Sequence, residues 1–593
     1  MNFKPHTFHI PVMGLGYTVD TPLKVAHLGI SSVISIVDDF LMEKMRKFYS
    51  LKLNLPFKEI TEGSDDSRAK RITAYLNMVD QLVSKKFEEL IDSVQKKESE
   101  LERYFDLLPD AESIRSRFSQ FVQGKSLDEI KNWLRANLIR GSIDVNIMTK
   151  LDKVNYKNKE PLPIEYNDAH AALRGFANST LSSSLILSAG MNPRLYSYLE
   201  RFEDFYPNEE GILKKKIILK VSDYRSALVQ GRMMAKKGIW ISEYRVESGL
   251  NCGGHAFATQ GNLLGPILEE FREKKTDLIR EIFSVYIAAL EAKGKTRPKK
   301  APEIKITAQG GVGTNEEHQF LLDTYQLDSI GWGSPFLLVP EVCNIDRGSL
   351  DLLKNAGEED LYLSNASPLG VPFNNVKNST QQKQISRYLQ EGKSGFPCTK
   401  RYLALNTDYT ERPVCTASRL YQRKKKEELK HDGSSEERQR ETIELLSQKE
   451  CLCEGLTSSA YLASQIPSDT PRTGVSICPG PNIAYFNEET SLAEMICHIY
   501  GKANLLGSIN RPNLFIKELK MYVDYLDTKS RELDKNNDQK QIAYYTCFKK
   551  NLQEGINYYK QLFSRHEDTL KAMKRNVFSD LDFFNRKLES IRL

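Results

Sequence analysis

Eight short apolar segments that alternate with helical patterns constrain the fold of this chain more than any other feature. Most of them are followed by a stretch with helical spacing, which predicts a parallel sheet covered on both faces. Eight such repeats, several ending in polar residues, favour a closed (β/α)8 TIM barrel over an open sheet. The predicted strands are Phe8–Met13, Ser32–Val37, Ile143–Met148, Ser184–Ser188, Ile217–Val221, Ile239–Tyr244, Ile304–Ala308 and Ser329–Trp332.

The rest of the chain is too long to be connections within a barrel. Residues 39–140 read as long amphipathic helices, and ordinary loops are much shorter, so we expect a helical insertion there. Residues 342–491 are rich in Ser, Asn, Gly and Pro at first and then carry a charged helix. We expect them to lie over the barrel mouth as a loop-rich extension. Residues 492–593 form a C-terminal helical region, which leaves 1–38 and 141–341 for the barrel.

Composition narrows the class of protein and its partners. Of 593 residues, 40% are hydrophobic and 27% charged, and 84 basic against 78 acidic side chains leave a net charge of +6. This balance gives no reason to expect nucleic acid or an anionic membrane as a partner. No apolar signal core or run of about 18 apolar residues is present. Nine scattered cysteines indicate reduced thiols, so we expect a cytoplasmic protein.

The stretch from 303 to 341 has the pattern of a phosphate site. A buried strand runs directly into Gly310 and Gly311, a helix is predicted over Asn315–Tyr325, and the next strand ends in Gly333 and Ser334. Glycine lets backbone N–H groups approach a ligand closely. In (β/α)8 barrels, the loops after strands seven and eight and a helix N-terminus commonly bind phosphate. We therefore predict a phosphate site in these two turns.

A second informative segment, RVESGLNCGGH, follows the sixth predicted strand. Gly253 and Gly254 would let the backbone approach a flat ligand, and His255 would lie at the barrel mouth. Histidine has a pKa suited to proton transfer near neutral pH. A structural histidine that caps the following helix is the alternative. The predicted phosphate site two units later favours the catalytic interpretation.

These segments together resemble a known family. RVESGLNCGGH, AQGGVGT and DSIGWGSPFLLVPE are similar to the FMN-dependent (β/α)8 barrels of the nitronate monooxygenase (2-nitropropane dioxygenase) type, which are related to FMN-dependent enoyl reductases. The same resemblance extends to a Met-Gly turn at Met13 and Gly14, a strand-end Asn146, a strand-end Lys220 and the helix Leu263–Phe271. It covers roughly residues 8–341 apart from the insertion.

The resemblance implies a role for each matching residue. Lys220 and Asn146 would hydrogen-bond the polar edge of the isoalloxazine ring, with Lys220 near N1 and O2. His255 would be the acid or base that faces the substrate. Met13 and Gly14 would lie against the ring, and the remaining cofactor-binding residues, most of them around the phosphate, would be Gly253, Gly254, Gln309, Gly310, Gly311, Gly333 and Ser334.

Two activities follow from the resemblance. In the monooxygenase version, His255 removes a proton beside an electron-withdrawing group, electrons pass to FMN, and dioxygen reoxidises it. In the enoyl-reductase version, NAD(P)H is the reductant and a conjugated thioester is reduced. The chain has Asn251-Cys252 where the monooxygenases usually have Glu-Ala, and Gly333-Ser334 where they have Gly-Thr. These departures leave the substrate open, a nitronate or an enoyl thioester, and a homodimer remains open as well.

A different class of function is also open. The helical insertion and the C-terminal region are large enough to be interaction surfaces on a barrel that has lost catalysis. The intact glycine turns count against this scaffold hypothesis, because a scaffold has no physical need for them. The cysteines are a rival site for zinc or an iron–sulfur cluster, with Cys451, Cys453 and Cys478 downstream of Cys398 and Cys415. Their irregular spacing lacks paired CxxC motifs, so we expect no metal.

Overall fold

A computed structural model gives the structure of the chain for residues 5–96, 99–188, 190–251, 259–431, 433, 435–467, 474–506, 511–533, 539–565 and 577–593. Its centre is a closed barrel of eight parallel strands in the order β1-β10-β9-β8-β7-β6-β3-β2. The (β/α)8 prediction is therefore confirmed. The strands are β1 Phe8–Ile10, β2 Ser31–Ser35, β3 Ile143–Ile147, β6 Ser184–Leu187, β7 Lys216–Val221, β8 Ile241–Glu247, β9 Lys305–Gln309 and β10 Ser329–Gly331.

All eight predicted strands coincide with barrel strands, with shifts at their ends. The shift with the largest consequence is at β8, which continues to Glu247 rather than ending at Tyr244. Glu243, Arg245 and Glu247 alternate with Tyr244 and Val246 in this strand. Charged residues at every second position resemble an exposed turn in the sequence, whereas here they face the interior of the barrel.

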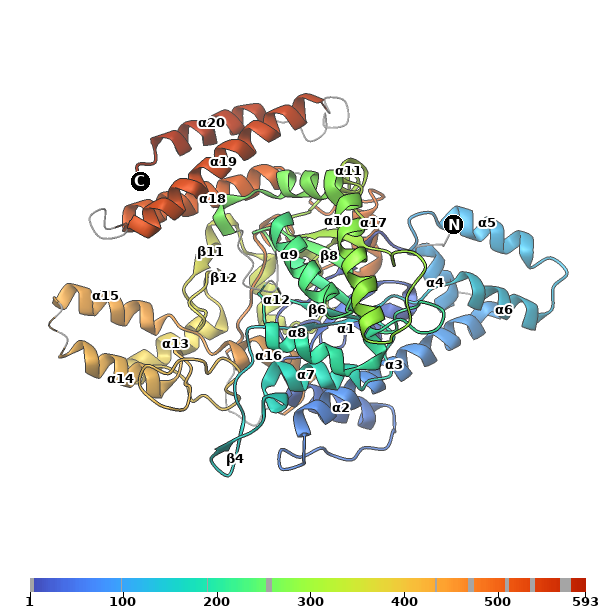
Figure 1. The fold of residues 1–593 in the computed structure, drawn as a ribbon, viewed down its shortest axis with the longest axis horizontal. Coiled ribbons are helices and arrows are strands. Elements are labelled where there is room, and N and C mark those ends of the chain that lie inside the picture. The colour runs from blue at the N-terminus through green and yellow to red at the C-terminus, as the bar shows by residue number, and fades with distance from the viewer. Residues whose placement is uncertain are drawn as a thin grey trace.

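Helices surround the barrel on the outside, as Figure 1 shows. The connection between β2 and β3 contains a 26-residue helix that packs against α7 and α1. It therefore lies in the outer ring, although it belongs to the segment predicted as an insertion. The helices up to α12 are α1 Thr21–Val25, α2 Asp39–Lys52, α3 Ser67–Asp92, α4 Glu100–Asp106, α5 Ala111–Phe121, α6 Leu127–Asn137, α7 Asp168–Ala177, α8 Pro193–Tyr198, α9 Tyr224–Ala235, α10 Leu264–Ala292, α11 Asn315–Tyr325 and α12 Arg347–Lys354.

The helices α4–α6, α14–α15 and α18–α20 stand out from the barrel in three different directions (Figure 1). Two antiparallel pairs, β4 Tyr156–Lys157 with β5 Glu160–Pro161 and β11 Leu361–Ser364 with β12 Phe373–Val376, were not predicted. The remaining helices are α13 Thr380–Gln390, α14 Arg419–Leu429, α15 Glu436–Ser447, α16 Leu452–Ala463, α17 Leu492–Ile499, α18 Leu514–Glu532, α19 Gln539–Arg565 and α20 Val577–Ser590. Within the described ranges, no helix has both the length and the apolar composition that a membrane crossing requires.

The inside of the barrel is unusually polar. Side chains alternate between the two faces of a strand, and bulky branched residues dominate the interior of most such barrels. Here a small apolar cluster, separate from the main core, is formed by Val12, Val33, Ile186 and Ile218. We call it the apolar layer. Polar and charged side chains lie on both sides of it, toward the carboxyl ends of the strands and toward their amino ends.

Candidate functional site

Four polar side chains point into the barrel at the carboxyl ends of β3, β7, β8 and β9, and we call them the mouth group: Asn146, Lys220, Glu247 and Gln309. Each follows, two residues on, a side chain that faces the interior, so all four point inward. Glu247 is the centre of the group. Its Oε1 atom lies 3.0 Å from Lys220 Nζ and accepts a hydrogen bond of 2.6 Å from Gln309 Nε2.

Two amide oxygens of the mouth group lack a hydrogen-bond partner among the described residues. Asn146 is 5% exposed and Gln309 is 1% exposed, and neither Asn146 Oδ1 nor Gln309 Oε1 receives a donor. An unsatisfied buried polar atom costs about 1–3 kcal/mol, so such atoms are rare unless a ligand or water completes them. Their position at the carboxyl end of the barrel is where ligands bind in this fold.

The glycine pair after β9 is a point of close backbone contact. Gly310 has a φ of +109° and Gly311 a φ of +85°, which favour glycine at both positions. A Cβ atom on Gly310 would lie 2.8 Å from Asn251 N, and one on Gly311 would lie 2.6 Å from Leu250 Cδ1. The turn that leads into the GGH segment therefore packs directly on the turn predicted to bind phosphate.

An arginine from the C-terminal region contacts the same turn. Arg511 donates to the carbonyl oxygen of Gly311, to Asn482 Oδ1 at 2.7 Å and to Glu317 Oε1 at 2.7 Å. Glu317, in the first turn of α11, also accepts from the Gly313 N–H at 2.9 Å. Arg511 and Glu317 have side-chain exposures of 6% and 2%. This buried ion pair places both a cation and a carboxylate beside the predicted phosphate site.

The other predicted turns are also covered by the extension. Ser334 is buried, and a Cβ atom on Gly480 would lie 2.4 Å from its hydroxyl oxygen. Gly333 is the N-cap residue of the short 3-10 helix Ser334–Leu338. At the first strand, Met13 is buried and a Cβ atom on Gly14 would lie 3.5 Å from Leu456 of α16. Gly480 and Leu456, both within residues 342–491, therefore lie next to these two turns.

Gly253, Gly254 and the predicted catalytic His255 lie outside the described residues. Both flanks of this segment contact one side chain of α18. Glu518 accepts from the Ser248 hydroxyl at 2.8 Å and from the Leu264 N–H at 2.8 Å. Burial raises the pKa of Glu518 to about 7, although the hydrogen bonds from Leu264 and Ser248 oppose this rise. A residue from the C-terminal region therefore holds the two ends of the segment that carries His255.

The residues present fit FMN at its ring end. Either unsatisfied amide oxygen would accept from the N3–H group of the isoalloxazine ring, and Lys220 lies on β7, between the strands of Gln309 and Asn146 in the barrel order. At the phosphate end, Gly310, Gly311, Gly333 and Ser334 converge with Arg511, but Glu317 already occupies the Gly313 N–H. In the described part of the chain, no three Cys, His, Asp or Glu side chains form a metal site.

Sequence reasoning missed four residues of this site: Glu247, Glu317, Arg511 and Glu518. Glu247 had a local signal, because it stands in RVESGLN at the end of a strand. Continuing the predicted strand beyond Tyr244 in the same alternation would have placed Glu247 inside the barrel. Glu317 had the signal of an acidic residue in the first turn of a helix. Arg511 and Glu518 had no local signal, since their partners lie 194 and 270 residues away.

Comparisons with known proteins yield structural likenesses only. No family model and no curated protein matches this chain. Among solved structures, the enoyl reductase domain of MlnA from Bacillus amyloliquefaciens matches 68% of this chain and 89% of its own length, at 15% identity and a TM-score of 0.33. FabK from Thermotoga maritima matches 88% and 96%, at 11% identity and a TM-score of 0.33.

Nitroalkane oxidase from Streptomyces ansochromogenes matches 84% of this chain and 95% of its own length, at 9% identity and a TM-score of 0.32. Because the likenesses are so distant, they do not bear on the cofactor or substrate of this chain. We therefore argue its function from the site.

Proposed function

We propose that this chain is an FMN-dependent oxidoreductase whose substrate, a small molecule, binds at the carboxyl end of the barrel. The observation that carries this proposal is the mouth group, in which the oxygens of Asn146 and Gln309 are buried and unsatisfied and Gln309 binds Glu247 of the Lys220–Glu247 ion pair. A flat, polar heterocycle with N–H groups would satisfy those oxygens. The glycine turns next to them would allow its backbone contacts.

In this proposal the protein binds and orients, and bound FMN supplies the two-electron chemistry. Asn146 and Gln309 would fix the ring by hydrogen bonds. Lys220 would place a positive charge near the ring, and Glu247 would hold that lysine in position. Gly310, Gly311, Gly333 and Ser334 would present N–H groups and a hydroxyl to the phosphate, with Arg511 adding a cation.

The finer activity that we propose is that of a nitronate monooxygenase. His255 would remove a proton from the carbon next to the nitro group, and dioxygen would be the final oxidant. The sequence resemblance supports this choice, because RVESGLNCGGH carries the histidine in the matching place. The alternative is an enoyl thioester reductase that uses NAD(P)H. The Gly333-Ser334 departure supports this alternative. In either case the proposed location is the cytoplasm.

The visible absorption spectrum of the purified protein tests the cofactor. We expect the bands of oxidised flavin and the release of about one FMN per chain on denaturation. Turnover with nitronates and dioxygen, compared with turnover of enoyl thioesters and NAD(P)H, then separates the two activities. His255→Ala should abolish turnover while flavin stays bound. A colourless protein that does not take up added FMN would refute the oxidoreductase proposal.

One observation favours the scaffold alternative. Glu317 accepts the Gly313 N–H at the start of α11, where an anionic ligand would otherwise bind, and Arg511 neutralises it. The Gly313 N–H group and the Glu317 carboxylate thus both have partners without a phosphate. If the scaffold alternative holds, the chain does not bind FMN, and a stable partner is captured through residues 39–140. FMN uptake therefore decides between the two functions.

A further inference from the structure

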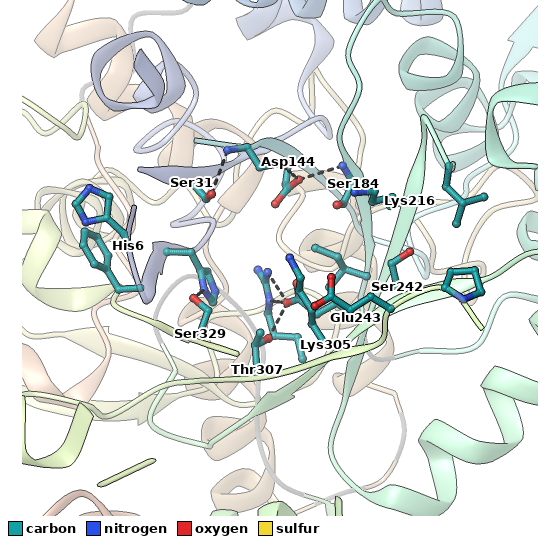
Figure 2. Close-up of a pocket in the computed structure, with 18 of the residues that line it drawn as sticks. His6, Ser31, Asp144, Ser184, Lys216, Ser242, Glu243, Lys305, Thr307 and Ser329 are labelled. Carbon is teal, nitrogen blue, oxygen red and sulfur yellow. Dashed lines mark hydrogen bonds and ion pairs between the residues drawn. The ribbon is translucent and has the colours of Figure 1, made fainter. Parts of the chain in front are cut away.

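The opposite end of the barrel contains a cavity, which Figure 2 shows. It has a volume of about 430 Å³ and is lined by side chains from the amino ends of all eight strands. We call it the floor cavity. The apolar layer separates it from the mouth group, and its residue Ile218 lines the cavity wall. The floor cavity is therefore distinct from the site proposed for FMN, and the inference below does not depend on that function.

A buried arginine faces this cavity with one nitrogen unused. Arg245 lines the cavity and is 3% exposed, and its Nη1 atom has no hydrogen-bond partner among the described residues. Its Nε and Nη2 atoms both bind Glu243 Oε1, at 2.8 and 2.7 Å. Thr307 donates to the same oxygen at 2.6 Å. Glu243 is thus neutralised, while Arg245 keeps a donor free for an acceptor in the cavity.

Basic and acidic side chains balance around the cavity. Lys216 and Lys305 line it, and among the described residues neither lysine has an ion pair. Asp144 is the remaining buried carboxyl of the wall, and burial raises its pKa even though Ser142 and Arg245 oppose the rise. Glu243 pairs with Arg245, and the exposed Glu303 also lines the cavity, so the carboxyls of Glu303 and Asp144 offset the two lysines. The free Nη1 atom of Arg245 is therefore the group that favours an anionic ligand.

Hydroxyl groups complete the lining. Ser31, Ser184, Ser242 and Ser329 lie around the cavity near the starts of four strands (Figure 2). Hydroxyls both donate and accept hydrogen bonds, so they suit a ligand that itself carries hydroxyls. The volume is within the range of small-molecule sites, roughly 300–1,000 Å³. If this end of the barrel served stability alone, we would expect apolar side chains to fill it.

We propose that the floor cavity binds a small hydroxylated organic anion, a sugar acid or a sugar phosphate, with Arg245 Nη1 as the donor to its anionic group. Lys216 and Lys305 would attract the anion at the rim, and the serine hydroxyls would bind its hydroxyls. This is a binding site in addition to the proposed flavin site. It lies at the end of the barrel where catalytic sites are not found.

Isothermal titration of the full chain tests the proposal, with D-gluconate, sn-glycerol 3-phosphate and the uncharged D-sorbitol as probes. We expect at least one anion to bind with 1:1 stoichiometry and a Kd below about 1 mM, and sorbitol to bind at least about tenfold more weakly. Binding of D-gluconate would indicate a carboxylate ligand, and binding of sn-glycerol 3-phosphate would indicate a phosphate ligand. If neither anion gives saturable heat up to about 10 mM, water fills the cavity and the proposal is wrong.

Two variants locate the binding. Arg245→Lys keeps a positive charge near Glu243 but removes Nη1, so it should weaken anion binding at least about tenfold. Arg71→Lys is the matched control, because Arg71 is also buried and binds a carboxylate, Asp39 Oδ2 at 2.9 Å, elsewhere in the molecule. Ser242→Phe narrows the cavity and leaves Arg245 unsubstituted. If Arg245→Lys does not fold, this variant tests whether the anion binds in the floor cavity. Unchanged affinity in the folded variants would overturn the assignment.

Discussion

The two ends of the barrel bury charge in different ways. At the mouth, Glu317 binds Arg511 of the C-terminal region, Glu518 of that region binds Ser248 of the barrel, and glycines allow the chain to pack closely. At the floor, the charged residues come from the strands themselves, as in the pair Arg245–Glu243, and serines border a cavity. The mouth therefore depends on distant segments of the chain. The floor depends on the alternation within single strands.

Arg511→Ala should have the largest effect, because it breaks the cover of the mouth. It leaves the buried Glu317 without its cation and should lower the free energy of unfolding by about 3–5 kcal/mol. The FMN content of the purified Arg511→Ala protein should also fall. Urea denaturation and the absorption spectrum measure the two effects.

Arg347→Ala is the control for that variant, since Arg347 is 65% exposed and pairs with Glu489 on the surface. A surface pair contributes about 0–1 kcal/mol. Equal losses from the two arginine variants would show that the cover of the mouth is not held by its buried ion pair.

The pH dependence of stability is the second test of the mouth. Glu518 has a pKa raised to about 7 from an ordinary value of 4.5, mainly by burial. The folded state keeps this proton at pH values where the unfolded chain has released it, so stability is highest below about 4.5 and falls as the pH rises to about 7. The loss between pH 5 and pH 8 should be about 2–3 kcal/mol.

Glu518→Gln should remove this part of the slope in denaturation measured at both pH values. The exposed Glu437→Gln is the control and should leave the slope unchanged. A wild-type slope retained by Glu518→Gln would mean that another group titrates.

Gly310→Ala tests the close approach at the mouth. A φ of +109° and a Cβ atom 2.8 Å from Asn251 N combine backbone strain with a clash, so we expect a loss of about 2–3 kcal/mol. Gly370→Ala separates the two causes, because Gly370 has a φ of +73° and open space around it. That variant should lose only about 1 kcal/mol. If thermal and urea denaturation gave the same loss of stability for Gly310→Ala and Gly370→Ala, the contact with Asn251 would not contribute to that loss.

Thr307→Val should have the smallest effect and tests the floor. It removes the 2.6 Å hydrogen bond to Glu243, but Arg245 still neutralises that carboxylate, so we expect a loss of about 1–2 kcal/mol. Flavin content should not change, because the apolar layer lies between this residue and the mouth. A colourless Thr307→Val protein would show that the two ends are coupled.

The fold was predictable from local patterns, and the site only in part. The eight strands are apolar, short and separated by helical spacing, so the barrel could be predicted without knowledge of distant contacts. Asn146, Lys220 and Gln309 were predicted through the family resemblance, in which each stands near the end of a strand. The polar interior could not be found in this way, since the alternation of Glu243, Arg245 and Glu247 reads equally well as an exposed edge.

The cover of the mouth could not be predicted for a different physical reason. Arg511 binds Glu317 and Gly311 through three-dimensional proximity, and no spacing in the sequence encodes it. The packing of Leu250 against Gly311 explains why that glycine is needed whether or not a phosphate binds. A glycine pair in a sequence therefore indicates close approach without saying what approaches.

The ion pair between Glu317 and Arg511 also sets an order of events during synthesis. The two residues are separated by 194 positions, which ribosomes translate in about 10–40 s at 5–20 residues per second. Throughout that interval the completed strands of the barrel present Glu317 and the glycine turns without their cover. The nascent chain therefore has an incomplete surface at the barrel mouth until Arg511 has emerged from the ribosome.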